Sequence, residues 1–366
     1  MIPLFEHFPL LRDKLPYRAL GEFPTPVEKL AQLGENIGLE QLYIKRDDVS
    51  AKLYGGNKVR KLEFLLGHAL QTRAKEVLTF GFAGSNHAVA TAIYAHHVGL
   101  KSISLLMPQP NAYYLRRNLL MSYYSGAELH QHRNVPLVAL GTMYQLLRHK
   151  LKYGSFPNVI AAGGSSPLGV IGFVNAAFEL KNQIARGELP EPDRVYVALG
   201  TTGTAVGLML GLKAANLKSR VIPVRVADEQ FANVRKMVKL FRATNSFLCA
   251  LDPAFPHVEL AEREINIRHE FFGPQYALFT REGMDAVHRM KQTEGIKLDG
   301  TYTGKALAAL IHDVENQEVK NEVLLFWNTY NARDLSEYTA AVDYHHLPRA
   351  FHPYFEEEVQ PLDSEL

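Results

Sequence analysis

Residues 194–212 read RVYVALGTTGTAVGLMLGL, and within this stretch the sequence pattern changes from strand to helix. Its first part, RVYVALG (194–200), contains valines and a tyrosine, which favour a β-strand. A loop of glycine and threonine, Gly200 to Thr204, follows, and the apolar residues after it predict a buried helix. A strand that leads directly into a helix is the first half of a crossover unit. This stretch therefore favours an α/β fold with a parallel sheet.

The same alternation of strand and helix patterns recurs from about Glu76 onward. Further strand-like runs are EVLTFGF (76–82), KSISLLM (101–107), PNVIAA (157–162), SRVIPVRVA (219–227) and EVLLFWN (322–328). We therefore predict mostly parallel sheets with helices covering both faces. The segment AAGGSSPLG (161–169) interrupts the pattern and is a candidate hinge between two sheets.

The composition is that of a globular protein that binds small molecules. The 366 residues are 47% hydrophobic and 21% charged, which is enough for one large or two modest domains with a sizeable core. The 40 basic and 38 acidic residues are spread along the chain. The resulting net charge of +2 favours neither nucleic acid nor an anionic membrane as a partner.

Cysteine usage and the N-terminus bear on the compartment. Cys249 is the single cysteine, so neither an internal disulfide nor a Cys-x-x-Cys pair can form, which favours the reducing cytoplasm. We expect Cys249 to be buried as an apolar residue. The first twenty residues lack the pattern of a targeting segment, and no window is long enough to span a bilayer. Adjacent histidines, 96–97 and 345–346, point in different directions on a helix, so we expect no metal site.

A lysine opens a predicted helix in YGGNKVRKLEFLL (54–66). The helix is indicated by apolar residues spaced three and four apart, which are Leu62, Leu65, Leu66, Ala69 and Leu70. Lys58 then lies at the helix N-terminus, where unpaired N–H groups and a partial positive charge disfavour a protonated amine. A partly neutral lysine is a nucleophile toward carbonyls and can form a Schiff base. The preceding Gly55 and Gly56 would allow the backbone to approach a ligand closely.

The Gly200 to Thr204 loop is a candidate anion site, because loop N–H groups and hydroxyls at a helix N-terminus commonly bind phosphate. If the carbonyl partner of Lys58 is pyridoxal phosphate, this loop would hold its phosphate. The spacing matches neither the Rossmann nor the P-loop motif. Tight helix packing explains the glycines equally well.

Three segments resemble signature sequences of the D-cysteine desulfhydrase and 1-aminocyclopropane-1-carboxylate deaminase family. They are KRDD…YGGNKVRKLEFLL, GSNHAVATA (84–92) and LDGTYTGKAL (298–307), and they occur in the family's order over roughly residues 20 to 335. The resemblance implies a pyridoxal 5'-phosphate enzyme of fold type II, like the tryptophan synthase β-subunit, with two three-layer α/β domains. It also implies a large domain of residues 1–66 and 165–366, a small domain of residues 67–164, and a homodimer.

The resemblance also assigns cofactor-binding residues. Lys58 corresponds to the lysine that binds the cofactor covalently and later moves the substrate's α-proton. Lys61 corresponds to a lysine that contacts the phosphate, and Asn86 to the asparagine that meets the phenolic oxygen. The phosphate loop corresponds to Thr201, Thr202, Gly203 and Thr204.

Substrate-binding residues follow from the same resemblance. Ser85, Asn86 and His87 correspond to the segment that receives the substrate carboxylate at a helix start, and Ser85 is also a plausible helix N-cap. Tyr302 corresponds to the tyrosine beside the cofactor and substrate. Tyr276 lies where the family often has a tyrosine between two glycines.

The residue at the pyridine nitrogen separates the two activities of the family. By the resemblance, the deaminase has a glutamate where this chain has Thr303, whereas the desulfhydrase uses a threonine after the last strand, here Thr329. Together with His87, these residues favour elimination from D-cysteine to give pyruvate, ammonia and sulfide. Two alternatives stay open: a 1-aminocyclopropane-1-carboxylate deaminase that yields 2-oxobutanoate and ammonia, and a non-catalytic protein that binds the cofactor or an amino acid.

The chain departs from the family pattern at several positions. These are Val89 in place of an arginine, Tyr330 and Asn331 in place of two glycines, and Gln275 and Ala277 around Tyr276. We hypothesise that Tyr330 and Asn331 alter substrate preference. The acidic C-terminal sequence YFEEEVQPLDSEL (354–366) is expected to be an exposed or frayed tail.

Overall fold

The computed structural model describes residues 2–319 and 321–364, which form an α/β structure with two separate sheets. The larger sheet has the strand order β1 (Val27–Lys29), β2 (Leu42–Arg46), β9 (Leu324–Asn328), β7 (Arg194–Leu199) and β8 (Arg220–Arg225). The short β1 pairs antiparallel with β2, and the other strands are parallel. The predicted fold class and the three predicted strands of this sheet are confirmed.

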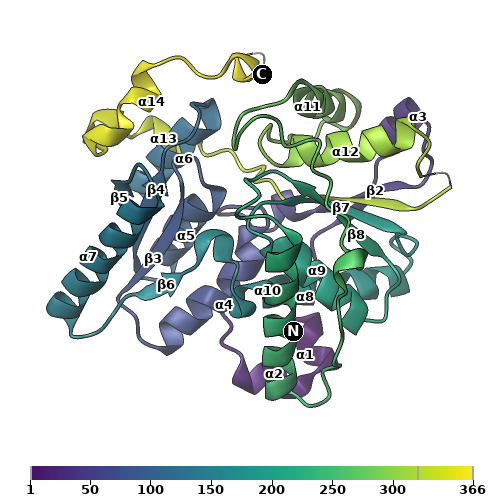
Figure 1. Ribbon diagram of the computed structural model, residues 1–366, viewed down its shortest axis with the longest axis horizontal. Helices are drawn as coiled ribbons and strands as arrows, with labels where there is room; N and C mark the ends of the chain where they lie inside the picture. The colour runs from purple at the N-terminus through teal and green to yellow at the C-terminus, as the bar shows by residue number, and fades with distance from the viewer. Residues whose placement is uncertain (1, 320, 365–366) are drawn as a thin grey trace.

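Helices cover both faces of the larger sheet, as predicted (Figure 1). One face carries α3 (Ala31–Ile37), α11 (Arg281–Glu294) and α12 (Thr303–Glu315). The other carries α8 (Pro167–Ala185), α9 (Gly203–Ala214) and α10 (Val234–Leu251), with α1 (Pro3–His7) and α2 (Pro9–Lys14) beyond them.

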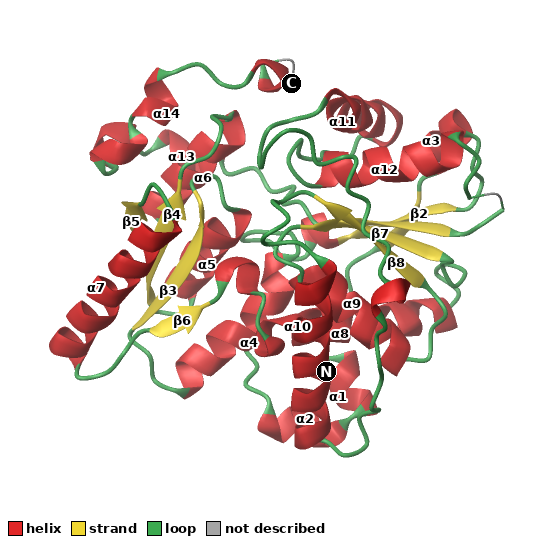
Figure 2. Ribbon diagram, in the orientation of Figure 1, coloured by secondary structure: helices red, strands yellow, loops and turns green. Residues whose placement is uncertain are grey.

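The smaller sheet is fully parallel, with the order β5 (Glu128–Gln131), β4 (Lys101–Met107), β3 (Glu76–Phe82) and β6 (Asn158–Ile160). Figure 2 shows α7 (Val135–Tyr153) on its outer side, whereas α5 (Asn86–His97) lies on the side toward the larger sheet. Next to α5 lies α6 (Tyr113–Tyr124). The division of the chain after residues 66 and 164 stays a prediction, and so does the hinge at 161–169.

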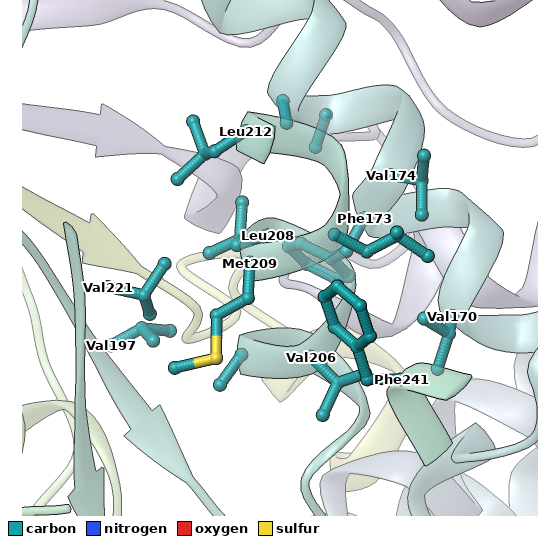
Figure 3. Close-up of a cluster of buried hydrophobic side chains, with 14 of the residues drawn as sticks. Val170, Phe173, Val174, Val197, Val206, Leu208, Met209, Leu212, Val221 and Phe241 are labelled. Carbon is teal, nitrogen blue, oxygen red and sulfur yellow. The ribbon is translucent and has the colours of Figure 1, made fainter. Parts of the chain in front are cut away.

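The glycines of α9 allow close packing against α8. A Cβ at Gly207 would lie 2.4 Å from the Cβ of Phe173, and one at Gly211 would lie 2.6 Å from the Cβ of Ala177. Figure 3 shows side chains of both helices interdigitating with Phe241 of α10. Packing against α8 therefore accounts for Gly207 and Gly211, and it leaves the role of the preceding loop open.

Helix α4 (Lys58–Gln71) begins at Lys58, as predicted. Leu62, Leu65, Leu66 and Ala69 are buried, but so are Arg60, Lys61 and Glu63 on its other sides. This burial on all sides arises because α4 packs against both α5 and α8. Cys249 is buried, also as predicted. Among the described residues, no helix combines the length and the apolar character needed to cross a bilayer.

The prediction of a frayed tail at residues 354–366 is wrong for residues 354–364, although Glu356, Glu357 and Glu358 are exposed as expected; residues 365 and 366 lie outside the described residues. After β9 the chain forms α13 (Ser336–Ala340) and then a segment of short helical turns with α14 (Pro353–Glu356). In this last segment Phe351, Gln360 and Asp363 are buried. A sequence pattern without helical or strand periodicity gave no signal for this packing.

A buried group of charges, the Arg60 cluster, joins the layers of the larger sheet to α4. Arg60 Nη2 lies 2.7 Å from Asp47 Oδ1, and Arg60 Nη1 lies 2.9 Å from Glu179 Oε2. Lys45 Nζ lies 2.6 Å from Glu179 Oε1. The indole Nε1 of Trp327 donates to Asp47 Oδ2 at 2.8 Å. One cluster therefore connects β2, the turn after it, α4, α8 and β9.

The first prediction concerns Glu179. Burial alone would raise its pKa, but the charges of Arg60 and Lys45 outweigh burial and lower the pKa to about 2. Glu179 therefore contributes stability that is present above its unfolded pKa, about 4.3, and is lost as pH falls toward 2. We expect Glu179→Gln to lower the free energy of unfolding by about 3–5 kcal/mol, because it leaves buried cations underpaired.

Urea unfolding at neutral pH and at several values below pH 5 measures this effect. The exposed pair of Arg289 and Glu315 offers a matched control, and Glu315→Gln should cost less than about 1 kcal/mol. If both variants lose the same free energy of unfolding, the Arg60 cluster stabilises the fold no more than a surface ion pair does.

Candidate active site

A cavity of about 230 Å³ lies where the carboxyl ends of both sheets meet. Its wall includes residues at the ends of β3, β4 and β7 and the residue that follows β9. Ligand sites of parallel sheets commonly occupy this position. All the predicted site residues line it: Lys58, Lys61, Ser85, Asn86, His87, Thr201, Thr202, Gly203, Thr204, Tyr276, Tyr302 and Thr329.

Lys58 lines the cavity and is the first residue of α4. Burial lowers its pKa to about 8, although the nearby Asp299 carboxylate acts in the opposite direction. Within the described residues, its Nζ has no hydrogen-bond partner. The preceding Asn57 fixes this helix start, because its N–H donates to Thr329 O at 3.2 Å and its Nδ2 donates to Thr204 Oγ1 at 3.1 Å.

The expected role of Gly55 and Gly56 needs correction. A Cβ at Gly55 would lie 2.1 Å from Asp48 O, and Gly56, at φ +88°, would place one 3.0 Å from Thr329 O. The two glycines therefore permit close approach to other backbone segments, with no ligand needed to explain them. Their effect is to bring Lys58 and Thr329 to the same cavity.

The Thr201–Thr204 segment forms a cradle at the N-terminus of α9. Ser165 braces this cradle, since its Oγ lies 2.8 Å from Thr201 Oγ1 and accepts a hydrogen bond from Gly203 N at 3.2 Å. Lys61 reaches the same place, and a Cβ at Gly203 would lie only 2.8 Å from Lys61 Nζ. Lys61 Nζ also donates to Gly163 O at 3.0 Å.

The cradle fits a phosphate-bearing cofactor. Burial, and then the neighbouring Lys58, hold the pKa of Lys61 well below its usual range. Among the described residues, neither lysine forms an ion pair with a carboxylate. A dianion beside the α9 N-terminus would supply the missing negative charge, and it would also be met by helix N–H groups. The site therefore has the donors that a phosphate requires.

The Ser85–His87 segment forms the start of α5. Ser85 is the N-cap, with its Oγ accepting from Ala88 N at 3.2 Å. Asn86 Oδ1 accepts from Asn118 Nδ2 at 2.9 Å and from Tyr54 OH at 3.5 Å. Because its oxygen is occupied, Asn86 can present its N–H₂ group to the cavity. Val89 follows His87 by two positions, where the family commonly has an arginine, and it is buried in a hydrophobic cluster.

His87 brings an imidazole without a well-formed hydrogen bond to the cavity wall. Both ring nitrogens are buried and form no hydrogen bond of good geometry with the described residues, although an interaction with the Ala161 backbone acts to raise the pKa. Burial, followed by the charges of Lys58 and Lys61, holds its pKa well below the usual value, so the ring is neutral. A buried neutral imidazole of this kind can both donate to and accept from a bound molecule.

Two tyrosines lie next to each other on the cavity wall. The hydroxyls of Tyr276 and Tyr302 share a short hydrogen bond, and the ring of Tyr276 packs 4.3 Å from that of Phe82. Burial raises the pKa of both phenols well above the usual value. Both are therefore neutral proton donors across the physiological range.

The residues that distinguish the family branches occupy different places. Thr329 lines the cavity, whereas Thr303 is fully buried and donates to Asp299 Oδ2 at 3.0 Å. Tyr330 OH accepts from Arg117 at 3.3 Å, and Asn331 Oδ1 accepts from Gly55 N at 2.7 Å. Since neither of the last two residues lines the cavity, an effect on substrate preference would have to pass through Arg117 or the Gly55 backbone.

Sequence reasoning missed Asn57, Ser165 and Asp299 as parts of this site. Asp299 lines the cavity and accepts from the backbone N–H groups of Thr301 at 2.9 Å and Tyr302 at 2.6 Å. Desolvation raises its pKa. An Asp-Gly pair just before a helix was the available signal, because aspartate commonly accepts from N–H groups two and three residues ahead.

Comparison with known proteins agrees with this geometry. Residues 18–329 match the family described as pyridoxal-phosphate dependent enzyme, so the chain belongs to that family. It is 34% identical over 334 residues to the D-cysteine desulfhydrase of Serratia proteamaculans (strain 568), covering 87% of this chain and 97% of that protein. It is 35% identical over 323 residues to the D-cysteine desulfhydrase of Klebsiella pneumoniae (strain 342), covering 86% and 94%.

Solved structures support the same assignment. A crystal structure described as an ACC deaminase homologue superposes with a TM-score of 0.76 at 31% identity, covering 88% of this chain and 94% of that one. Threonine deaminase isoform 2 from Solanum lycopersicum gives a TM-score of 0.60 at 16% identity, covering 91% and 86%, and shows likeness of fold alone. The predicted family, fold type and pyridoxal 5'-phosphate dependence are confirmed, and the protein is an enzyme of this class.

The low pKa of Lys58 leads to a second prediction. Because the amine is neutral above pH 8 rather than above its usual 10.5, cofactor-free protein should bind pyridoxal phosphate covalently with a rate that rises through a midpoint near pH 8. The visible absorbance band that forms on mixing gives the rate. Lys58→Ala should form no band, and Lys52→Ala, at a side chain 85% exposed, should behave as wild type. A midpoint near 10.5 would contradict the environment described for Lys58.

Proposed function

We propose that the enzyme is a D-cysteine desulfhydrase, which eliminates sulfide from D-cysteine to give pyruvate and ammonia. The observation that carries this proposal is the hydroxyl of Thr329 on the cavity wall, combined with the absence of a carboxylate at position 303. Identity of 34% and 35% to two D-cysteine desulfhydrases supports the same choice.

The geometry supports the cofactor-binding roles that the family resemblance implies. Bound pyridoxal phosphate supplies an electron sink for the bonds to the substrate's Cα. Lys61, the cradle of residues 201–204 and the α9 N-terminus would hold the phosphate. Thr329 would offer a hydroxyl to the ring nitrogen, and a hydroxyl does not keep that nitrogen protonated as a carboxylate would. Asn86 would donate its free N–H₂ group to the phenolic oxygen.

The substrate would bind across the start of α5. Ser85 and the first N–H groups of this helix suit an α-carboxylate, because a helix N-terminus attracts anions. The neutral ring of His87 provides one further donor there. The Lys58 amine, with a pKa of about 8, is neutral above that pH and would then be able to remove the proton from Cα.

The tyrosine pair would serve the leaving group. A thiolate that departs from Cβ needs a proton, and Tyr302 and Tyr276 are neutral phenols that can deliver one. Their shared hydrogen bond lets the second hydroxyl stabilise charge on the first. With a good leaving group, the negative charge formed at Cα is discharged by elimination, so a weaker electron sink suffices. The opening of a cyclopropane ring has no leaving group at Cβ, so the negative charge is not discharged in this way.

A substrate comparison tests the proposal. Wild-type enzyme should form pyruvate and sulfide from D-cysteine and no 2-oxobutanoate from 1-aminocyclopropane-1-carboxylate. Tyr302→Phe should lower kcat by about 10²-fold or more, because it removes a proton donor, and Lys58→Ala should be inactive. Keto acid from the cyclopropane substrate alone would favour the deaminase, whereas cofactor binding without turnover of any amino acid would favour a binding protein.

We also propose that the enzyme is a cytoplasmic homodimer, paired through α7. Five large apolar residues on this helix are exposed by 40% to 81% at spacings of three, four, three and four. They are Leu137, Leu140, Tyr144, Leu147 and Leu151. Such a seam is typical of a helix that packs against another helix. A second copy of the chain offers the same seam, and the pairing is then self-complementary.

Light scattering after size-exclusion chromatography tests the dimer. The wild type should have twice the 41.1 kDa mass of one chain, and Leu140→Asp with Leu147→Asp should give the single-chain mass. Leu10→Asp is the matched control, because Leu10 is 51% exposed on α2, away from α7. A dimer that survives the double substitution would exclude this interface.

A further inference from the structure

Tyr276 is carried by a loop without regular secondary structure, residues 273–279, called here the Tyr276 loop. Its backbone is unusual, because Ala277 adopts φ +63°. A left-handed conformation costs a residue with a Cβ about 1 kcal/mol or more, so neighbouring groups must hold it in place. Tyr276 itself reaches the cavity from the residue directly before Ala277.

Gln360 holds this strained position from the other end of the chain. Its Oε1 accepts from Phe279 N at 2.7 Å, and its Nε2 donates to Ala277 O at 3.1 Å. The carboxamide thus pairs with the backbone on both sides of Leu278, in the manner of a strand partner. Lys305 of α12 adds a hydrogen bond to Leu278 O at 2.7 Å. Gln360 is 8% exposed, so water does not compete for its amide.

The segment around Gln360 is attached to a different part of the molecule. Residues 349–363, called here the C-terminal strap, run along the top of Figure 1 from the smaller sheet toward α11. Asp363 accepts from Tyr113 N at 2.5 Å at the start of α6, where an acidic group is favourable. Gln360 N donates to Asn111 O at 3.1 Å, and Asn111 Nδ2 donates to Tyr354 O at 2.9 Å.

Residues beside these anchors reach the substrate side of the cavity. Gln109 Oε1 accepts from Gly84 N at 2.9 Å, directly before Ser85, and Gln109 N donates to Tyr354 OH at 3.3 Å. The strap therefore contacts the Tyr276 loop directly through Gln360, whereas Tyr354 contacts Gln109, which in turn contacts Gly84 before the start of α5. It spans the two sides between which the cavity lies.

We propose that Gln360 is a positioning residue, which holds the Tyr276 loop in the conformation that brings the Tyr276 hydroxyl to that of Tyr302. Together with the rest of the C-terminal strap, it connects this loop to the α6 side of the cavity. The effect on catalysis rests on the proposed function, in which the tyrosine pair acts on the leaving group. The positioning of the loop does not depend on the substrate. A misplacement of about 1 Å at such a loop can cost roughly 10²-fold in rate.

Two substitutions separate the hydrogen bonds of Gln360 from its volume. Gln360→Met keeps the size of the side chain and removes both bonds to the loop, whereas Gln360→Ala removes volume as well. In the holoenzyme, both should lower kcat for D-cysteine by about 10-fold to 10²-fold with unchanged cofactor content. Glu358→Ala, at an exposed position of the same strap, is the matched control and should leave kcat unchanged.

A double-mutant cycle distinguishes positioning from a general loss of structure. If Gln360 acts through Tyr276, then Gln360→Met should have little further effect on kcat/KM in a Tyr276→Phe background. Multiplicative losses would overturn the proposal. So would a wild-type kcat in Gln360→Met.

Hydrogen exchange gives a readout that does not need turnover. The Phe279 amide, which donates to Gln360, should exchange at least about 10-fold faster in Gln360→Met, with no change in the core strand β7. If D-cysteine is not a substrate but this exchange rises, the proposed function fails and the positioning of the loop stands. Unchanged exchange would overturn the positioning role itself.

Discussion

The Arg60 cluster is the constraint on which the rest of the structure depends. Arg60 is a buried residue of α4 and pairs with Asp47 and Glu179. Buried charges of this kind add little net stability compared with an apolar core, yet they tolerate only one arrangement because an unpaired buried charge is costly. The cluster therefore fixes α4 against α8 and β9. Lys58 and Thr329 are held at one cavity as a result.

The cavity gains its chemistry from the convergence of helix starts. Four helices, α4, α5, α9 and α12, begin at or next to the cavity wall, at Lys58, Asn86, Gly203 and Thr303. Each helix N-terminus carries unpaired N–H groups and a partial positive charge. This field suits a phosphate and a carboxylate, and it disfavours protonated amines. It acts together with burial, which lowers the pKa of both Lys58 and Lys61.

Much of the fold and site could be predicted from local pattern. The strands at 76–82, 101–107 and 194–199 were visible because they are long and apolar. Lys58, Lys61, Ser85, Asn86, His87 and Tyr302 lie in the three family motifs, whereas the 201–204 loop, Tyr276 and Thr329 lie outside them. The strands β1, β2 and β5 were missed, since each is short and β2 contains buried charge at Lys45. Asp299 was missed because its importance depends on which cavity it lines. The domain boundaries and the roles of the site residues stay predictions.

By itself, the sequence determined the α/β class, the parallel strands and the residue types needed for a pyridoxal phosphate site, because periodicity and short motifs are local properties. Only the tertiary structure decided which ionisable and polar side chains are buried away from water. It made Lys58 a weakly basic amine, left His87 neutral and seated Gln360 beside Ala277. The burial of a side chain and its hydrogen-bond partners depend on segments far apart in the chain, and residues 277 and 360 come into contact only after folding. No local pattern encodes such a contact.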